Sequence, residues 1–207
     1  MPRRGDPGRR VHLLVYSAEI GRRRESHGFT LIEVMVVLLV MAVLLAIAIP
    51  TFLSSRAGAQ DQSTQSDLSD ALVAARATSA DSGYYPAATG LISTLGSREP
   101  DLSFVKKAAK EGTNEISVNV SASGLQLVLV GFSASGVCWA LSDNNGDPSS
   151  AAWGQAPLGV AYVSWNPAAK GGKACNAANA FGGKEGKALA DGSWSDSYPS
   201  GTPSAKP

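Results

Sequence analysis

The chain has 207 residues, a length that suits one modest domain with an additional segment. Its formal net charge is only +1, but residues 1–28 hold seven arginines against three acidic residues, whereas the other 179 residues hold 11 basic and 14 acidic ones. A slightly acidic body without a basic patch lacks the electrostatic footprint of a nucleic-acid-binding protein, so no direct contact with nucleic acid is expected.

Residues 1–28 form a basic leader that also contains both histidines of the chain, His12 and His27. If the leader is removed, the rest of the chain lacks the most common general base and the most common zinc ligand. The sequence also contains no G-x-S-x-G motif and no glycine-rich phosphate loop. We therefore expect neither an enzyme nor a protein that holds a cofactor.

Residues 29–49 form an apolar run of 21 residues in which Thr30 and Glu33 are the only polar side chains. A helix of this length spans roughly 30 Å, the thickness of the hydrocarbon core of a membrane. Arginines precede the run and few charges follow it, so the positive-inside rule places the N-terminus in the cytoplasm and the body outside. A single-pass membrane precursor is therefore predicted.

Three interpretations of the apolar run differ in where the chain is cut. A secretory signal would be cleaved after the small residues of the segment Ala46 to Ala48, and a plain signal anchor would not be cleaved. Neither explains Glu33, because a carboxylate inside an apolar span costs about 2.5 kcal/mol or more and normally has a function. The third interpretation places the cut before the run, between Gly28 and Phe29.

The segment "GFTLIEVMVVLLVMAVLLAIAIP" (residues 28–50) resembles the N-terminal signature of type IV prepilins and pseudopilins, in which a basic leader ends in glycine and a long apolar helix follows. The resemblance implies that prepilin peptidase cuts after Gly28 and methylates the new N-terminus at Phe29. Glu33 falls at the fifth mature position and Pro50 at the twenty-second, which match the family's pattern, and both are expected to matter for assembly.

More than one role is open for Glu33. In its own chain it lies one helical turn after the amine that cleavage would create at Phe29, where a negative charge also suits the helix N-terminus. The family resemblance implies that Glu33 meets the Phe29 amine of a neighbouring subunit in the growing filament, and such a pair attracts strongly in a low dielectric. Alternatively, Glu33 reaches the membrane interface and has no partner.

Pro50 ends the apolar run, and a proline inside a helix usually kinks it. Helical character resumes over residues 50–83, and Gly83 is placed for a left-handed cap. One helix over about 30–82 is therefore predicted, apolar all round in its first half and amphipathic in its second. The apolar positions on one face of the second half are Leu68, Leu72 and Ala75.

Residues 84–207 are predicted to form an extracellular globular head. The stretch "GYYPAATGLISTLG" is interpreted as a loop whose aromatic residues cover the core, or as a helix exit resembling that of pilins. Three or four antiparallel strands packed on the amphipathic half of the helix give an α+β fold. The apolar alternation and the turn residues predict strands at 115–120, 125–132, 136–142 and 159–165.

The last 42 residues are rich in Gly, Ala, Ser and Lys and offer few apolar side chains for a core. Cys175 lies in this C-terminal loop and Cys138 in the third predicted strand. Two cysteines in an exported body predict one disulfide, which would pin the loop to the sheet. A disulfide-closed C-terminal loop also resembles that of many pilins.

Two further features are weak site candidates. Asp143, Asn145 and Asp147 place oxygen ligands at a calcium-like spacing, but the distal bidentate glutamate of an EF-hand is missing, so a plain turn is preferred and no metal is predicted. Four tryptophans could form a stacking face for a sugar, although a place in the core or at a filament contact is more common. They are Trp139, Trp153, Trp165 and Trp194.

These features predict a type IV pilin-like precursor that polymerises through its N-terminal helix into a cell-surface filament, with a role in adhesion, motility or DNA uptake left open. The partners implied by the family are prepilin peptidase, the inner-membrane assembly platform and the extension ATPase. A type II secretion or DNA-uptake pseudopilin is the nearest alternative. A membrane-anchored carbohydrate-binding module is an alternative from another class.

Overall fold

The computed structural model describes residues 28–146, 156–169, 173–179 and 194–199. The chain divides into two compact units between Leu45 and Ala46, and each is described by itself. The first helix, α1 (Leu31–Ser79), crosses this boundary, while the second helix and the sheet belong to the second unit. The predicted single helix over about 30–82 is therefore confirmed.

The glycine that the sequence indicates, Gly83, caps the end of α1. Gly83 has a φ of 74°, in the left-handed region, and its N–H donates to the carbonyl of Ser79 at 2.8 Å. This bond satisfies one of the carbonyls left free at the end of a helix, and glycine adopts such a conformation without a Cβ penalty. The chain then turns back toward the sheet.

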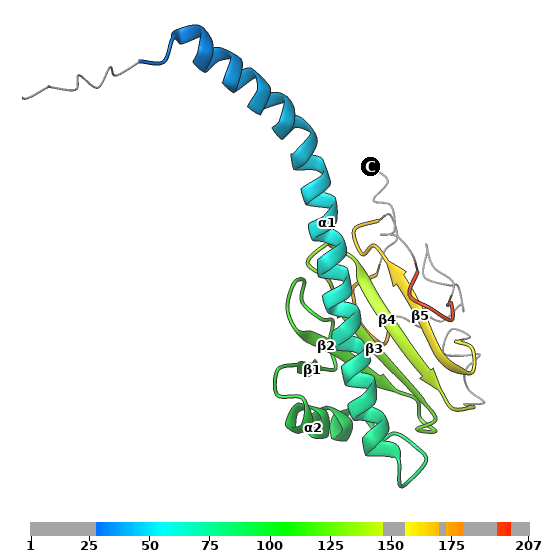
Figure 1. The fold of residues 1–207 in the computed structure, drawn as a ribbon. Helices are drawn as coiled ribbons and strands as arrows, with labels where there is room; N and C mark the ends of the chain where they lie inside the picture. The colour runs from blue at the N-terminus through cyan, green and yellow to red at the C-terminus, as the bar shows by residue number, and fades with distance from the viewer. Residues whose placement is uncertain (1–27, 147–155, 170–172, 180–193, 200–207) are drawn as a thin grey trace, which may run out of the picture. The chain divides into compact units, whose positions relative to one another are not determined.

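The second unit contains a five-stranded sheet with the strand order β1-β2-β3-β4-β5 (Figure 1). The four predicted strands are present, and consecutive pairs among them are antiparallel, as expected. A short first strand adds to the edge and runs parallel to β2, so the sheet is mixed. The strands are β1 (Ser103–Val105), β2 (Glu115–Val120), β3 (Gln126–Phe132), β4 (Cys138–Asn144) and β5 (Gly159–Trp165).

A second helix, α2 (Ala88–Arg98), occupies the stretch interpreted from the sequence as a loop or a helix exit. Its buried residues Ala88, Leu91 and Leu95 recur at helical spacing and pack into the core. Gly90 and Gly96 lower its intrinsic helix propensity, so burial of the apolar face is what stabilises it. The parallel strand β1 was not predicted either, because three residues are too few to show an alternation.

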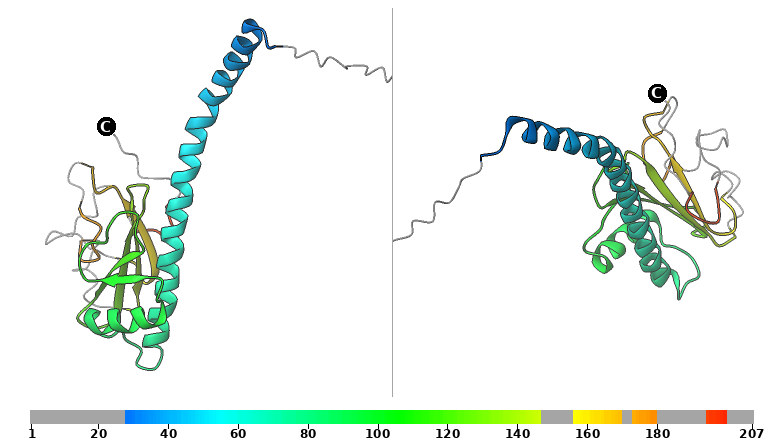
Figure 2. Two further views of the ribbon diagram at one scale, coloured as in Figure 1. Left: turned by 90° about the vertical axis from the view of Figure 1, so that its left-hand side faces the viewer. Right: turned by 45° about the horizontal axis from the view of Figure 1, so that its top comes forward.

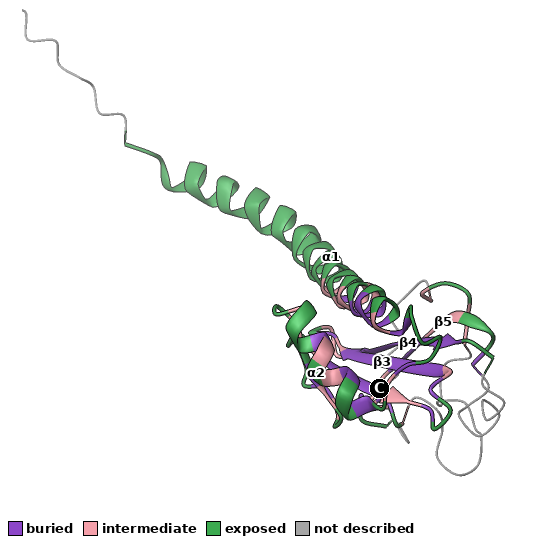
Figure 3. Ribbon diagram, turned by 90° about the horizontal axis from the view of Figure 1, so that it is seen from below, coloured by how far each residue is buried: buried purple, intermediate pink, exposed green. Residues whose placement is uncertain are grey.

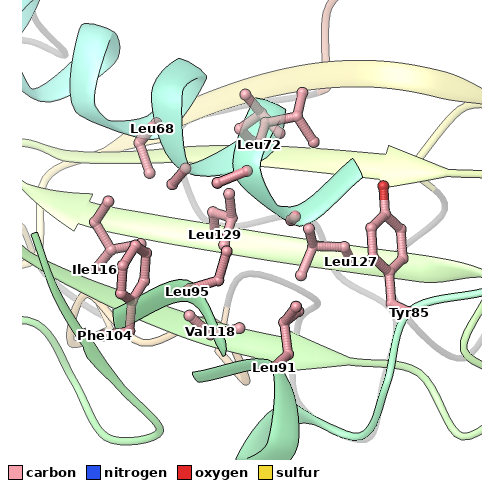
Figure 4. Packing of buried hydrophobic residues seen from close by; sticks show 14 of the residues in the cluster. Leu68, Leu72, Tyr85, Leu91, Leu95, Phe104, Ile116, Val118, Leu127 and Leu129 are labelled. Atoms are coloured by element: carbon pink, nitrogen blue, oxygen red, sulfur yellow. The ribbon is translucent and has the colours of Figure 1, made fainter. Parts of the chain in front are cut away.

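The main core lies between the sheet and the two helices. Leu68 and Leu72 of α1 point toward Leu129 and Leu127 of β3, and all four are nearly or fully buried (Figure 4). α2 contributes Leu91 and Leu95 to the same cluster. α1 runs along one face of the sheet in the two turned views of Figure 2, and α2 shares the buried cluster on that face.

A second, smaller core covers the opposite face of the sheet. Cys138 of β4 forms the predicted disulfide with Cys175, and their Cα atoms are 5.3 Å apart. The indole N–H of Trp165 donates to the carbonyl of Lys173, and the N–H of Ala177 donates to the hydroxyl of Ser117. Closing a loop with a sequence separation of 37 stabilises the fold by about 4 kcal/mol in the chain-entropy model. The buried residues are Val128, Val130, Cys138, Ala140, Val163, Trp165, Cys175 and Ala177.

A further piece of the C-terminal loop, residues 194–199, lies beside β5. Ser195 exchanges two backbone hydrogen bonds of 2.9 Å with Tyr162. Tyr198 packs against Tyr162 with the two rings tilted by 48°, packs edge-on against Trp139 and donates its hydroxyl to the carbonyl of Gln65 in α1. The loop therefore contributes more to the core than its composition suggested, because aromatic residues carry its contacts.

Gly131 in β3 allows α1 to approach the sheet closely. A Cβ at this position would lie 2.6 Å from Cγ2 of Thr64, which is closer than real Cβ contacts come. Thr64 is β-branched and lies in a helix, so its side chain has little freedom to move away. The absence of a side chain at Gly131 therefore lets Thr64 of α1 lie close to the backbone of β3.

We predict that Gly131→Ala lowers the free energy of unfolding by about 1–3 kcal/mol, because the helix must shift from the sheet. Chemical denaturation of the full-length protein in detergent measures this change. Thr64→Ser in the Gly131→Ala background should restore most of the loss, because it removes the clashing methyl group. Gly96→Ala is the matched control, since open space surrounds Gly96 in α2 and alanine favours the helix by up to about 1 kcal/mol.

Candidate processing and assembly segment

The proposed cut site directly precedes α1. Gly28, Phe29 and Thr30 are exposed and lie outside the helix, and Phe29 retains 81% of its accessible surface. The carbonyl of Thr30 accepts the N–H of Val34 at 3.2 Å, the first bond of the helical pattern. The Gly28–Phe29 bond therefore lies in accessible, non-helical backbone, the conformation that a peptidase needs.

Thr30 caps the start of α1. Its hydroxyl accepts the backbone N–H of Glu33 at 3.3 Å, which satisfies one of the amides that a helix start leaves free. The segment Thr30–Glu33 also fits the sequence pattern of a capping box, Ser or Thr followed three residues later by Glu or Gln. Reasoning from the sequence missed this local role, although the pattern is readable in "TLIE".

Glu33 itself is exposed in the first turn of α1. A carboxylate there is stabilised by the positive end of the helix dipole, by up to about 1 kcal/mol at an exposed site. This stabilisation is smaller than the about 2.5 kcal/mol or more that a carboxylate costs inside a membrane. A local role at the helix start does not by itself account for a glutamate in this run.

Within the part of the chain that the structure describes, nothing covers the apolar surface of the first part of α1. No residue from 28 to 56 is buried or half-buried, and the ribbon is green throughout this range in Figure 3. Among the described residues, α1 is the helix that is long and apolar enough to span a membrane, with a mean hydropathy of 3.1 over its most apolar 18 residues. Such a surface is stable only against lipid or other apolar helices.

α1 continues through Pro50 without a break. Proline has no N–H to donate, so the carbonyl four residues earlier loses its usual donor. Just after it, the hydroxyl of Thr51 donates to the carbonyls of Ile47 and Ala48 at 3.1 and 2.9 Å. Ser55 donates in the same way to the carbonyl of Thr51 at 3.0 Å. Side-chain bonds of this kind slightly destabilise a helix, so they add to the local weakening that the proline causes.

The far end of α1 is fastened to β4 by a charged cluster. Nε and Nη2 of Arg76 donate to the two carboxylate oxygens of Asp143 at 2.8 and 3.0 Å, and the hydroxyl of Tyr85 also donates to Asp143. The hydrogen bond to Asp143 raises the pKa of Arg76. The pKa of Tyr85 is also raised, mainly by burial and secondly by its hydrogen bond to Asp143. This geometry explains how a fully buried aspartate is tolerated.

The cluster bears on the weak calcium candidate of Asp143, Asn145 and Asp147, because Asp143 belongs to both. Both oxygens of Asp143 are used by Arg76 and Tyr85, and its side chain lies on the helix-facing side of the sheet. Asn145 donates its backbone N–H to the carbonyl of Leu125 at 2.8 Å, next to the last pair of β3 and β4, and Asp147 lies outside the described residues. Within those residues, no group of three or more His, Cys, Asp or Glu side chains could hold a metal.

A second buried carboxylate fastens the middle of α1. Asp61 accepts hydrogen bonds from the hydroxyl of Ser135 and from the indole N–H of Trp139, the latter at 3.0 Å. Trp139 is therefore held in the core, and Trp165 is also almost fully buried. Trp194 is half-buried, and Trp153 lies outside the described residues. Neither of the two buried tryptophans is available as a stacking face for a sugar.

Comparison with protein-family models matches residues 23–49 to the prokaryotic N-terminal methylation motif. This motif is the signature of type IV pilins and pseudopilins, and the matched range includes Gly28, Phe29 and Glu33. Comparison with curated proteins and with solved structures finds no match.

We predict that Tyr85, which belongs to the Arg76 cluster, makes the protein less stable at alkaline pH. The pKa of Tyr85 is raised in the folded state, so its contribution is fully present below the unfolded pKa of about 10 and is lost as the pH rises above it. Tyr198 acts in the same direction through burial. Tyr85→Phe should flatten the decline of the unfolding free energy between about pH 9 and 11, although it lowers stability at pH 7.

Denaturation midpoints measured across this pH range test the prediction, with Tyr198→Phe as a second variant. The double variant should show the shallowest slope, because neither phenol remains to ionise on unfolding. Equal slopes in the wild type and in Tyr85→Phe would contradict the assignment.

Proposed function

We propose that this chain, whose residues 23–49 carry the N-terminal methylation signature of type IV pilins and pseudopilins, is a structural subunit of a type IV pilus-like extracellular filament. The observation that carries the proposal is the coincidence of this motif with the first part of α1, whose apolar side chains are not covered by any other described residue. Prepilin peptidase would cut between Gly28 and Phe29 and methylate Phe29. The mature subunit would polymerise through the apolar part of α1.

The proposal gives the exposed apolar surface two successive environments. In the precursor, the surface lies in the cytoplasmic membrane, with the basic leader in the cytoplasm and the head outside. In the filament, the same surface packs against the corresponding helices of other subunits. Transfer between lipid and a helix bundle exposes little apolar surface to water, so extraction from the membrane does not carry the full cost of hydration.

The role proposed for Glu33 follows from the same transfer. Cleavage creates a cationic amine at Phe29, and an isolated amine and an isolated carboxylate are both costly in an apolar environment. Pairing Glu33 of one subunit with the Phe29 amine of the next removes both costs and fixes the stagger between helices. Apolar packing then supplies cohesion, while the charge pair supplies the register.

The remaining partners are proposed from the family signature. An inner-membrane platform and an extension ATPase would drive assembly, and the subunits themselves form a homopolymer.

We propose no catalytic role, and the lack of histidine in the chain after residue 28 supports this. The disulfide-closed C-terminal loop favours a pilus over a type II secretion or DNA-uptake pseudopilus, which is the second candidate. A sugar-binding module based on tryptophan stacking is less favoured, because Trp139 and Trp165 are buried.

Mass spectrometry of the mature protein tests the processing step. We expect a chain that begins at an N-methylated Phe29, and we expect Gly28→Lys to accumulate the uncut precursor, because the cut site no longer fits the pattern. A mature N-terminus at Ile49 would identify an ordinary secretory signal. An intact leader in the wild type would identify an uncleaved anchor, and either result would overturn the proposal.

The Glu33→Gln variant separates the charge of Glu33 from its place in the capping pattern. Glutamine also fits the capping box, so the start of the helix is retained while the negative charge is lost. We expect normal cleavage at Gly28 but a loss of surface filaments in electron micrographs. Thr30→Ala is the matched control, since it removes the cap hydroxyl at a cost of about 1 kcal/mol but leaves the charge, and should still assemble. Filaments at wild-type level in Glu33→Gln would refute the pairing role.

A further inference from the structure

The second unit contains an open cleft of about 430 Å³ that none of the roles above uses. One wall is the connection between α1 and α2, from Tyr84 to Ala88, and the other is the turn between β2 and β3, from Asn119 to Gly124. Lys106, just after β1, completes the lining. A volume in this range is typical of sites for small ligands or for one or two units of a longer chain.

The two walls of the cleft are held together by direct bonds. The N–H of Tyr85 donates to the carbonyl of Gly124 at 2.7 Å, and the hydroxyl of Tyr85 is anchored on Asp143. Gly124 has a φ of 74°, and a Cβ there would lie 2.8 Å from the carbonyl oxygen of Tyr85. The walls therefore approach as closely as the backbone allows, and the cleft exists before any ligand binds. Figure 4 shows the side chain of Tyr85, which belongs to this connection, beside Leu127 of the main core.

The charge of the cleft favours an anionic ligand. Lys106 is the one charged residue in its lining, no acidic residue lines it, and the described residues form no ion pair with Lys106. Asn119 also lines the cleft, and its side-chain carbonyl already accepts the N–H of Val120 at 3.1 Å. The amide group of Asn119 is left as a donor, so both groups prefer acceptors such as carboxylate and hydroxyl oxygens.

The cleft also offers an aromatic face. Tyr84 retains 54% of its accessible surface, although most large apolar side chains of the second unit beyond residue 60 are buried. Its ring edge lies beside Gly124, where a Cβ would come within 3.5 Å of Cδ2. An exposed ring next to hydrogen-bond donors is suited to a ligand that has one apolar face and several polar groups on its edge.

We propose that this cleft binds an acidic sugar unit of a polysaccharide. Lys106 pairs with the carboxylate of the sugar, Asn119 donates to its ring or hydroxyl oxygens, and the C–H face of the sugar packs on Tyr84. This site is separate from the tryptophans considered above. All the residues that line the cleft belong to one subunit, so the site is complete in the isolated chain.

Isothermal titration calorimetry on the full-length protein in detergent tests the proposal, with trigalacturonate as the probe and its methyl ester as the neutral comparison. We expect the acid form to bind and the ester to bind at least tenfold more weakly. Lys106→Ala should weaken binding about tenfold, and Lys106→Arg should retain most of it. Lys107→Ala is the matched control, because Lys107 is also an exposed lysine but does not line the cleft.

Tyr84 provides an independent arm of the same experiment. Tyr84→Phe keeps the ring and should bind like the wild type, whereas Tyr84→Ala should bind several-fold more weakly. No binding of trigalacturonate to the wild type, or an equal loss in Lys106→Ala and Lys107→Ala, would overturn the proposal. Binding of a triaspartate peptide as tightly as trigalacturonate would also overturn it, because the cleft would then recognise charge without a sugar. None of these outcomes depends on whether the protein forms filaments.

Discussion

The unpartnered apolar surface of the first half of α1 is the constraint on which the rest of the molecule depends. No element of the described chain covers residues 29–53, and water cannot stabilise them. The second half of the same helix has the opposite character, because Leu68, Leu72 and their neighbours are buried against the sheet. One helix thus combines a surface that needs an external partner with a surface that is satisfied within the chain.

The second half of α1 is fastened to the sheet by more than apolar contact. Asp61 and Arg76, about four turns apart, bind polar groups of the sheet side, and both aspartates involved are almost fully buried. Gly131 lets the helix approach between these points. Buried polar contacts define one register of helix on sheet, since a slip by one turn would leave both carboxylates without partners. These contacts fix the second half of α1 on the sheet, while the apolar first half remains exposed for packing against lipid or other helices.

Both faces of the sheet are covered, and this explains why the strands are less amphipathic than a one-sided sheet requires. Leu127 and Leu129 face α1, while Val128 and Val130 face the segment that the Cys138–Cys175 bond holds in place. The low apolar content of the C-terminal loop suggested a peripheral role. A few residues, above all Cys175 and Tyr198, were enough to attach the loop, because each makes contacts that many small residues cannot.

The sequence by itself determined the N-terminal motif, the long helix with its glycine cap, the four antiparallel strands and the pairing of the two cysteines. Each of these rests on local periodicity, on a short pattern or on there being only one possible pair. Only the tertiary structure decided that α2 forms in spite of two glycines, that β1 pairs in parallel with β2, and that Asp143 binds Arg76 and Tyr85. It also decided that Tyr84, Lys106 and Asn119 line one cleft. The helical spacing of Ala88, Leu91 and Leu95 is readable in the sequence, but it is short and interrupted by two glycines. The other features depend on contacts between residues that are far apart in the chain, and such contacts leave no local pattern in the sequence.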